Sequence, residues 1–178
     1  MDENQRRILR GTLMIIRRAD GKYLLFHETK GVHKGMWIFS GGSYDTIKTE
    51  DRSETGIECV VRETQEETGI TPINPRFKAK IFFDNHLRIF PGETKIANFD
   101  YEGAYYLSTD YSGEAKPISP EGKEQGWFSY EETKNLPMHE GDRRFLEILE
   151  KSPLEKVIDG VIVHEGSRLK TDHFEFLN

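Results

Sequence analysis

The sequence predicts an α/β fold in a single domain that spans residues 1–178. Several runs rich in β-branched and long apolar residues are bounded by turn residues, which is typical of strands. Two segments open with a Ser/Thr-x-x-Glu pattern that favours the start of a helix. No repeat, low-complexity tract or interdomain linker divides the chain. Strands flanked by two or three helices indicate a layered domain, and 178 residues suffice to bury a core.

Two antiparallel strands are expected at the start of the chain. Residues 8–18 are rich in β-branched and long apolar side chains, and residues 22–27 continue the pattern after Asp20-Gly21. An Asp-Gly pair between two such runs is a strong signal for a hairpin. The glycine-rich residues 31–42 predict a loop that enters a short strand, and the polar residues 43–52 predict an exposed loop.

Residues 55–68 form the clearest helix in the sequence. Thr55-x-x-Glu58 fits a capping box, and Gly69 can adopt the left-handed conformation that ends a helix. Apolar residues and threonines recur at helical spacing and predict an inward face. This face consists of Ile57, Val60, Val61, Thr64 and Thr68.

The second half of the chain predicts further strands and two short helices. The strands are expected at residues 76–83, 99–107, 125–128, 156–164 and 168–176. The last two of these form a closing hairpin, because a Glu-Gly-Ser turn joins them. Ser129-x-x-Glu132 opens one helix, and residues 142–151 form another that Pro153 stops.

Charge and cysteine content narrow the function classes. The chain carries 25 Lys and Arg residues against 31 Asp and Glu residues, a net charge of −6. Duplex nucleic acid is held by a basic face that neutralises phosphates, so this balance argues against such a partner. The single cysteine, Cys59, excludes an intrachain disulfide. The polar start and the lack of a bilayer-length apolar run predict a cytoplasmic protein without a membrane partner.

Three carboxylates share one side of the predicted helix. Glu63, Glu66 and Glu67 fall at i, i+3 and i+4, well rotated from the inward face. Such a cluster repels itself unless a cation neutralises it, and hard divalent ions such as Mg²⁺ or Mn²⁺ prefer carboxylate oxygens. Mg²⁺ completes its shell with water and substrate phosphates, so the cluster suits phosphate chemistry. The plain alternative is a solvated, glutamate-rich helix face.

The residues around these carboxylates resemble the signature of the Nudix hydrolase family. The matching residues are Glu54, Arg62, Glu63, Glu66, Glu67, Gly69 and Ile70. Two departures from the pattern are visible. Thr64 occupies a position that is usually aliphatic. Residues 43–53 separate Gly42 from Glu54, where the family has only five residues, which indicates an insertion of six residues.

The resemblance implies an α/β/α sandwich with a mixed central sheet. It also implies metal-dependent hydrolysis of a nucleoside diphosphate linked to another group, with a small nucleotide as the substrate. Carried over by position, the metal ligands are the carbonyl of Gly42 and the side chains of Glu63, Glu66 and Glu67. Glu54 is expected nearby, where it reaches a metal through water. Mg²⁺ is the expected cofactor, with Mn²⁺ as the alternative.

Catalytic roles follow from the same resemblance. Arg62 is expected to orient the glutamates through charge-assisted hydrogen bonds rather than to touch substrate. Glu66 or Glu67 can accept the proton of the attacking water. In some family members a glutamate from a later loop is the base, which makes Glu121 the candidate and Glu124 the second choice. An ordinary charged loop is the alternative for this pair.

Two further segments are similar to MutT-type enzymes that clear oxidised purine nucleoside triphosphates. Residues 35–42 resemble their GxWxxxGG entrance, which includes Trp37. Residues 136–142 resemble the segment that supplies an aromatic side chain for stacking on the base and an acid that reads its edge. Asp142 matches the acid, and His139 stands where a tryptophan is usual. The resemblance therefore implies base contacts from Trp37, His139 and Asp142, with core packing as the alternative for Trp37.

The first hypothesis is a nucleoside triphosphate pyrophosphohydrolase similar to 8-oxo-dGTP diphosphatases, which serve nucleotide-pool sanitation and DNA repair. Ile38 replaces an asparagine that is often found there, so strict selectivity for 8-oxo-guanine is not expected. A nucleotide sugar, ADP-ribose or a capped RNA end stays open as the substrate. A catalytically silent module that senses nucleotides is the alternative from another class, and the intact glutamate set argues against it. The sequence leaves the oligomeric state open.

Overall fold

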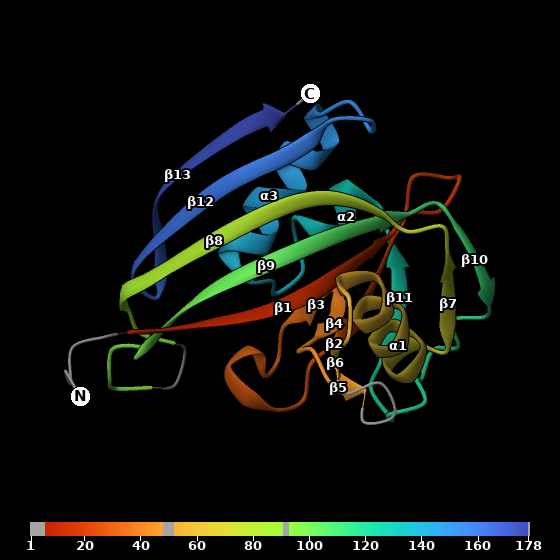
Figure 1. The fold of residues 1–178 in the computed structure, drawn as a ribbon, viewed down its shortest axis with the longest axis horizontal. Helices are drawn as coiled ribbons and strands as arrows, with labels where there is room; N and C mark the ends of the chain where they lie inside the picture. The colour runs from red at the N-terminus through yellow and green to blue at the C-terminus, as the bar shows by residue number, and fades with distance from the viewer. Residues whose placement is uncertain (1–5, 48–51, 91–92, 178) are drawn as a thin grey trace.

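Six strands form one mixed central sheet in the order β13-β12-β8-β9-β1-β4 (Figure 1). The computed structural model of the chain describes residues 6–47, 52–90 and 93–177. The strands are β1 (Arg7–Ile16), β4 (Ser40–Gly42), β8 (Arg76–Arg88), β9 (Phe99–Ser108), β12 (Val157–Gly166) and β13 (Arg168–Leu177). β1 runs parallel to β9 and β12 runs parallel to β8, whereas the other three pairs are antiparallel. The predicted mixed sheet is confirmed.

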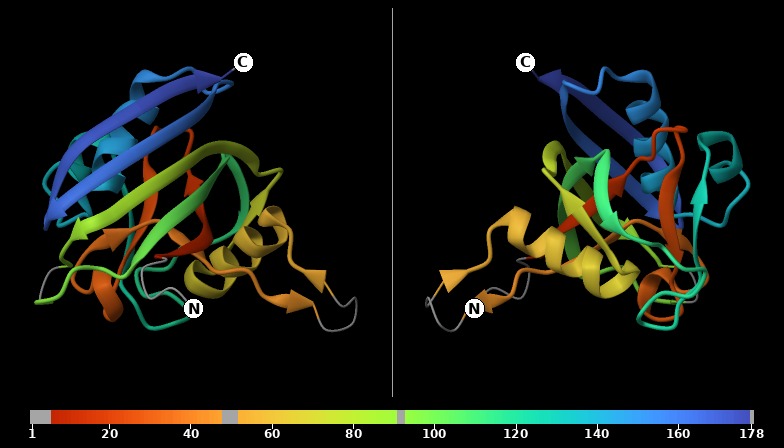
Figure 2. Two further views of the ribbon diagram at one scale, coloured as in Figure 1. Left: turned by 60° about the vertical axis from the view of Figure 1, so that its left-hand side comes forward. Right: turned by 90° about the vertical axis from the view of Figure 1, so that its right-hand side faces the viewer.

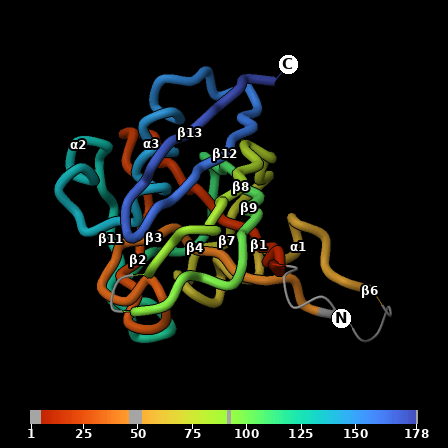
Figure 3. Tube along the Cα trace, turned by 90° about the vertical axis from the view of Figure 1, so that its left-hand side faces the viewer, coloured from red at the N-terminus to blue at the C-terminus, as the bar shows by residue number. Residues whose placement is uncertain are grey.

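Three smaller sheets complete the β-structure. A three-stranded sheet has the order β11-β2-β3, and two-stranded sheets pair β7 with β10 and β5 with β6. Their strands are β2 (Tyr23–His27), β3 (Trp37–Ile38), β5 (Thr46–Ile47), β6 (Arg52–Ser53), β7 (Ile70–Ile73), β10 (Asp110–Gly113) and β11 (Gln125–Phe128). Figure 3 shows the closing hairpin of β12 and β13 beside β8. The hairpin itself is the one predicted from the turn that joins these two strands.

The two longer helices cover opposite faces of the central sheet (Figure 2). The helices are α1 (Gly56–Thr68), α2 (Tyr130–Thr133), α3 (Glu140–Lys151) and a 3₁₀ turn at Gly31–His33. Met14 of β1 packs in an apolar cluster with Val60 of α1, whereas its neighbour Ile15 packs in another cluster with Phe145 of α3. Successive side chains of a strand point to opposite faces, so the layers are α/β/α. The predicted α/β fold is confirmed.

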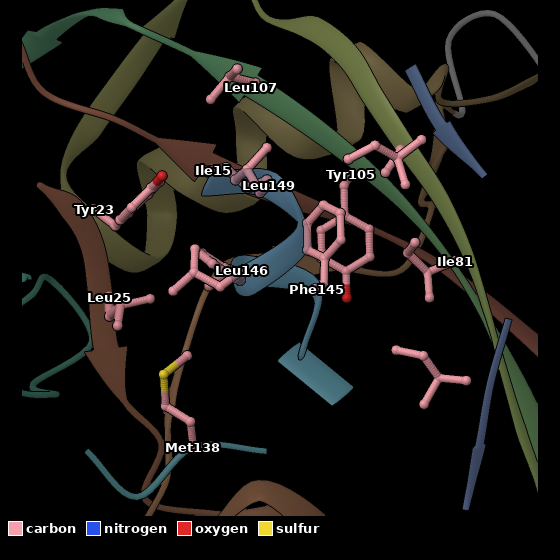
Figure 4. Packing of buried hydrophobic residues seen from close by; sticks show 14 of the residues in the cluster. Ile15, Tyr23, Leu25, Ile81, Tyr105, Leu107, Met138, Phe145, Leu146 and Leu149 are labelled. Carbon is pink, nitrogen blue, oxygen red and sulfur yellow. The ribbon is translucent and has the colours of Figure 1, made fainter. Parts of the chain in front are cut away.

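The larger apolar cluster lies between α3 and the central sheet (Figure 4). Phe145 and Leu146 of α3 are fully buried, and the ring of Phe145 lies 4.4 Å from that of Tyr105 on β9, measured between centroids. Burying one such side chain contributes about 1.5–3 kcal/mol. This packing fixes the beginning of α3 against the sheet, where His139 and Asp142 lie.

A buried lysine ties β8 to the segment that follows α3. The Lys78 Nζ donates to the carbonyl oxygens of Pro153, Leu154 and Lys156 at 2.9, 3.3 and 2.6 Å. Hydrogen bonds from a charged donor stabilise a fold more than neutral ones do, and buried carbonyls are costly to leave unpaired. We expect Lys78→Met to lower the free energy of unfolding in urea by about 2–3 kcal/mol.

The matched control for this variant is Lys80→Met on the same strand. Lys80 is exposed and forms an ion pair with Glu102, so its replacement should cost less than about 1 kcal/mol. Equal unfolding midpoints for the two variants would show that the three carbonyl contacts of Lys78 contribute no more to stability than the surface ion pair of Lys80.

The first hairpin differs from the prediction in one respect. The Asp20-Gly21 turn is present, and Arg17 pairs with Tyr23 in an antiparallel bridge. Beyond that bridge β1 joins the central sheet, whereas β2 joins β11 and β3. The two strands therefore separate into different sheets, because β1 pairs along ten residues with β9 and β2 pairs along four with β11.

The inserted segment is not the unpatterned loop that the sequence predicts. β5 and β6 pair antiparallel, with Thr46 opposite Ser53, and residues 48–51 lie outside the described residues. Figure 2 shows this pair projecting from the body of the fold before α1 begins. The described parts of the inserted segment, β5 and β6, therefore form an arm beside the start of the carboxylate helix.

Other differences are smaller. Ile57 is 48 % exposed rather than inward-facing, because it lies in the first turn of α1, while Val60, Thr64 and Thr68 are buried as predicted. β7 and β10 are not among the predicted strands, and β8 extends to Arg88 beyond its predicted end at Phe83. Among the described residues, no helix is long and apolar enough to cross a membrane.

Candidate active site

The carboxylate helix α1 begins and ends at strong local signals. The Thr55 hydroxyl accepts from the Glu58 backbone N–H, and the Glu58 carboxylate accepts from the Thr55 N–H, which completes a capping box. Gly69 adopts a φ of 77° and ends the helix in the left-handed conformation. The predicted helix is confirmed, and both ends hold its carboxylates in a fixed register.

Two adjacent glycines of β4 bring backbone against these carboxylates. The Gly41 N–H donates to Glu67 Oε2 at 2.9 Å. A Cβ on Gly42 would lie 2.3–2.7 Å from the carboxyl atoms of Glu63, so only glycine leaves room for that side chain. The junction of β4 and α1 therefore gathers backbone and carboxylate oxygens at one place.

Arg62 contacts three glutamates on the exposed side of the carboxylate cluster. Its guanidinium donates to Glu54 at 2.8 Å, Glu63 at 3.0 Å and Glu66 at 3.1 Å. The hydrogen bond to Glu54 is the largest of the effects that raise the pKa of Arg62. The same hydrogen bond lowers the pKa of Glu54 to about 2. Arg62 therefore contacts three glutamates at once, and its role in orienting them stays a prediction.

Glu67 is the buried member of the cluster. Burial raises the pKa of this carboxyl to about 8, although the Gly41 N–H and Lys123 act in the opposite direction. The Lys123 ammonium lies 3.8 Å from Glu67, 3.0 Å from Glu121 and 3.1 Å from Glu28. Lys123 thus brings Glu121, the predicted loop base, to the edge of the site.

Glu124, the second choice for that role, is placed differently. Its carbonyl accepts from the His27 N–H, and its side chain is exposed. Glu121 shares the Lys123 ammonium with Glu67, and its charge acts on the pKa of Glu67. The structure therefore places Glu121 close to the α1 carboxylates.

The donor set at this junction fits a hard divalent cation. Gly42 offers a carbonyl oxygen, and Glu63 and Glu67 offer carboxylates whose pKa burial raises, so their negative charge is poorly compensated by the chain. Glu66 also belongs to the predicted set, and its side chain is more exposed. Across residues 6–47, 52–90 and 93–177 no three acidic, histidine or cysteine side chains converge on one point, because Glu63 and Glu66 contact Arg62.

A cavity of about 290 Å³ opens on the other side of β4. Gly41, Gly42 and Ser43 form part of its wall, so it adjoins the carboxylate junction directly. Most of its lining is apolar and aromatic, and more than half of these residues lie on β1, β8 and β9. These apolar residues are Leu9, Leu13, Val32, Ile38, Phe39, Phe83, Phe90, Phe99, Tyr101 and Tyr105. The cavity therefore suits a flat, largely apolar group.

Two of the predicted base contacts line this cavity. Asp142 Oδ1 accepts from the Tyr105 hydroxyl at 3.0 Å, and burial raises the pKa of Asp142. His139 is buried next to it, with its ring 5.9 Å from that of Phe83, and burial lowers its pKa well below the usual value. The imidazole is therefore neutral at physiological pH, and its stacking surface is partly taken by neighbours.

Trp37 lies elsewhere. Its ring packs edge-on against Phe128 at 4.7 Å between centroids and lies 5.4 Å from His27. It is not part of the cavity lining, to which the neighbouring Ile38 and Phe39 contribute. The structure therefore does not bring Trp37 together with His139 and Asp142.

Arg88 is a cavity residue that the sequence analysis missed. It ends β8, five residues beyond the predicted end of that strand, and lines the cavity with Asn85. An arginine within the run Leu87-Arg88-Ile89-Phe90 is the one signal that pointed to it, because a charged residue among apolar neighbours is exceptional in a buried strand.

His164 makes the stability of this region depend on pH. It stacks on Phe83 and accepts from Arg88 Nη1 at 3.4 Å, and burial followed by Arg88 lowers its pKa from 6.5 to about 4. Between these values the unfolded chain binds a proton that the folded chain does not. The free energy of unfolding should therefore fall as the pH is lowered from about 6.5 to about 4.

Urea unfolding at pH 7, 5.5 and 4.5 measures this effect. His164→Asn should flatten the decline, whereas His173→Asn, which changes an exposed histidine, should not. Identical slopes for the two variants would show that His164 does not carry the pH dependence.

The NUDIX domain family matches residues 7–149 of this chain. The chain belongs to the Nudix hydrolase family. Members of this family act on nucleoside diphosphate derivatives and generally use divalent metal ions. This Nudix hydrolase is 29 % identical over 161 residues to the Nudix hydrolase YvcI of Bacillus subtilis, across 90 % of this chain and 87 % of that protein.

Solved Nudix structures resemble this one over most of their length. The MutT protein of Bacillus halodurans superposes with a TM-score of 0.71 and 26 % identity, covering 93 % of this chain and 97 % of that one. The NUDIX domain of NrtR from Shewanella oneidensis, solved with ADP-ribose, gives a TM-score of 0.64 and 17 % identity over 85 % and 92 % of the chains. The second likeness concerns the fold alone.

The departure from the family signature at Thr64 has a local explanation in this Nudix hydrolase. Thr64 is fully buried, and its hydroxyl donates to the Val60 carbonyl at 2.6 Å. The same oxygen lies 3.1 Å from the hydroxyl of Ser40 on β4. A polar pair therefore replaces an aliphatic contact between α1 and β4, with the hydroxyls satisfied.

Proposed function

We propose that this Nudix hydrolase is a Mg²⁺-dependent nucleoside triphosphate pyrophosphohydrolase that releases a nucleoside monophosphate and pyrophosphate. Oxidised purine nucleotides such as 8-oxo-dGTP are its preferred substrates, which gives it a role in nucleotide-pool sanitation. The observation that carries the proposal is that the two halves of the site share one wall. Gly41, Gly42 and Ser43 line an aromatic cavity of about 290 Å³, and Gly42 also lies against the Glu63 carboxylate of α1.

The α1 side of β4 is the phosphate side of this site. The proposed metal ligands are the Gly42 carbonyl, Glu63, Glu66 and Glu67. Mg²⁺, or Mn²⁺ in its place, would compensate their charge, polarise the phosphoanhydride and make a water molecule more acidic. Arg62 keeps Glu54, Glu63 and Glu66 in place through its hydrogen bonds. Because these carboxylates are already held in place, less entropy is lost when the reacting groups are brought together.

Two carboxylates are candidates for accepting the proton of the attacking water. Glu67 is buried and fixed by the Gly41 N–H at 2.9 Å, so its carboxylate is held in one place for a proton transfer. Glu121 lies on a neighbouring loop, linked to Glu67 through the Lys123 ammonium. We assign the role to Glu67 first, because it is buried and held by backbone.

A panel of nucleotides tests the proposed function. With Mg²⁺ present, 8-oxo-dGTP, dGTP and dATP are compared with ADP-ribose and a nucleotide sugar, and products are separated by ion-exchange chromatography. We expect the triphosphates to give monophosphate and pyrophosphate, with 8-oxo-dGTP giving the highest kcat/KM. Hydrolysis of ADP-ribose or the sugar without hydrolysis of any triphosphate would overturn the proposal. Nucleotide binding without any hydrolysis would support the silent-module alternative instead.

A further inference from the structure

Arg88 is a buried cation that faces the cavity without a carboxylate partner. Only 4 % of the residue is exposed, and it lines the cavity at the end of β8. Its guanidinium lies 4.3 Å from the centroid of the Phe90 ring, which covers one face. Within the described residues no acidic side chain forms an ion pair with Arg88. Burying a charge in this way is costly, so a compensating group is expected.

The hydrogen-bond partners of Arg88 are all neutral. Nη1 donates to Asn85 Oδ1 at 3.3 Å and to His164 Nδ1 at 3.4 Å, and Nη2 contacts His139 Nε2. The Nε–H is buried and has no acceptor. An unpaired donor of this kind, on a residue that lines a cavity, is expected to meet an acceptor on the ligand.

Asp142 stands on the other side of the same imidazole. Its Oδ1 accepts from the Tyr105 hydroxyl, while its Oδ2 lies 3.8 Å from His139 Nδ1, too far for a hydrogen bond. Arg88 and Asp142 therefore flank the two nitrogens of His139 on one wall of the cavity. The imidazole stands between this donor and this acceptor, and each keeps an atom without a hydrogen-bond partner among the described residues, Arg88 Nε and Asp142 Oδ2.

We propose that Arg88 and Asp142 together read the lactam edge of a base, which is a carbonyl oxygen beside a ring N–H. This inference rests on the proposed function, because that function places the base in this cavity. A carbonyl oxygen has two lone pairs and can accept from the Nε–H and a neighbouring Nη–H of a guanidinium at once. The ring N–H donates to the free oxygen of Asp142. Nucleotides of oxo-purines are therefore the substrate class.

Adenine is the discriminating contrast. It carries an amino group where hypoxanthine carries the carbonyl, and its adjacent ring nitrogen has no hydrogen. An adenine in the same pose would direct N–H donors at Arg88 and a lone pair at Asp142, so both buried groups would lose their partners. A site built around such hydrogen bonds rejects the wrong partner strongly.

The monophosphates dIMP and dAMP test this inference, because their bases differ only at that edge. Binding is measured by titration calorimetry without metal, so the result does not depend on turnover. We expect the wild-type protein to bind dIMP at least tenfold more tightly than dAMP. Arg88→Met should bring the two affinities within about twofold of each other. Arg76→Met, an exposed arginine on the same strand, should keep the wild-type ratio.

Two results would overturn the inference. One is equal affinity of the wild-type protein for dIMP and dAMP, which needs no variant. The other is a folded Arg88→Met protein, checked by thermal unfolding, that keeps the tenfold preference. Failure of the proposed function looks different: selective dIMP binding with no triphosphate hydrolysed would refute the pyrophosphohydrolase and leave base reading in place. Equal kcat/KM for dITP and dATP would refute base reading and leave the hydrolase in place.

Discussion

Replacing Glu67 by glutamine should lower kcat by about 10³-fold and leave the fold intact. The amide keeps an oxygen that accepts from the Gly41 N–H, so the contact between α1 and β4 survives. Removing a buried carboxylate whose pKa is raised to about 8 costs little stability. What is lost is a charged metal ligand and proton acceptor. Steady-state hydrolysis of dGTP measures kcat, and thermal unfolding of the same variant measures its stability.

Glu58→Gln is the matched control on the same helix. Glu58 accepts from the Thr55 N–H in the capping box and pairs with Arg52, and its exposed side chain does not line the cavity. Its replacement should lower the thermal unfolding midpoint slightly and leave kcat unchanged. A Glu67→Gln protein that turns over as fast as wild type would remove Glu67 from the site.

Gly42→Ala should lower kcat/KM by about 100-fold. The added Cβ would lie 2.3–2.7 Å from the carboxyl atoms of Glu63, and that side chain must move away. The obstacle is the far end of a flexible side chain, so the fold should tolerate the change. A displacement of about 1 Å in a ligand set is enough for a loss of this size. The Mg²⁺ concentration needed for half-maximal activity should rise as well.

Ser112→Ala is the control for the glycine variant. Ser112 is exposed on β10 and does not line the cavity, so activity should stay within about twofold of wild type. Unchanged activity and unchanged Mg²⁺ dependence in Gly42→Ala would show that the close approach of Gly42 to Glu63 plays no part in catalysis.

The carboxylate helix was predictable because its signals are local. The capping box at Thr55 and Glu58 and the glycine at the C-terminus act within a few residues, whatever the rest of the chain does. Helical spacing also placed Val60 and Thr64 on the buried face. It could not show that Ile57 is exposed, because that depends on where the sheet lies beneath the first turn.

The base cavity depends on contacts that no local pattern reveals. Arg88 and Asp142 are 54 positions apart, and they meet one imidazole because α3 packs across the end of β8. Periodicity ended β8 too early and left Arg88 out. The family pattern did find His139 and Asp142, whereas Trp37, taken from the same pattern, packs against Phe128 outside the cavity lining.

The strand pairings also include features that local sequence predicts and features that depend on distant contacts. The Asp20-Gly21 turn was visible, yet the separation of β1 and β2 into two sheets follows from the ten-residue parallel pairing of β1 with β9. β7 contains a proline and only four residues, so it carries little strand signal of its own. Its partner β10 supplies the pairing that defines it.

Titration calorimetry of Mg²⁺ tests the central claim most directly, in the presence of a non-hydrolysable nucleoside triphosphate. The wild-type protein should bind the ion saturably, and the Glu63→Gln/Glu67→Gln double variant should lose that binding while staying folded. Absence of any saturable heat with the wild-type protein would contradict the assignment of α1 as the metal-binding element.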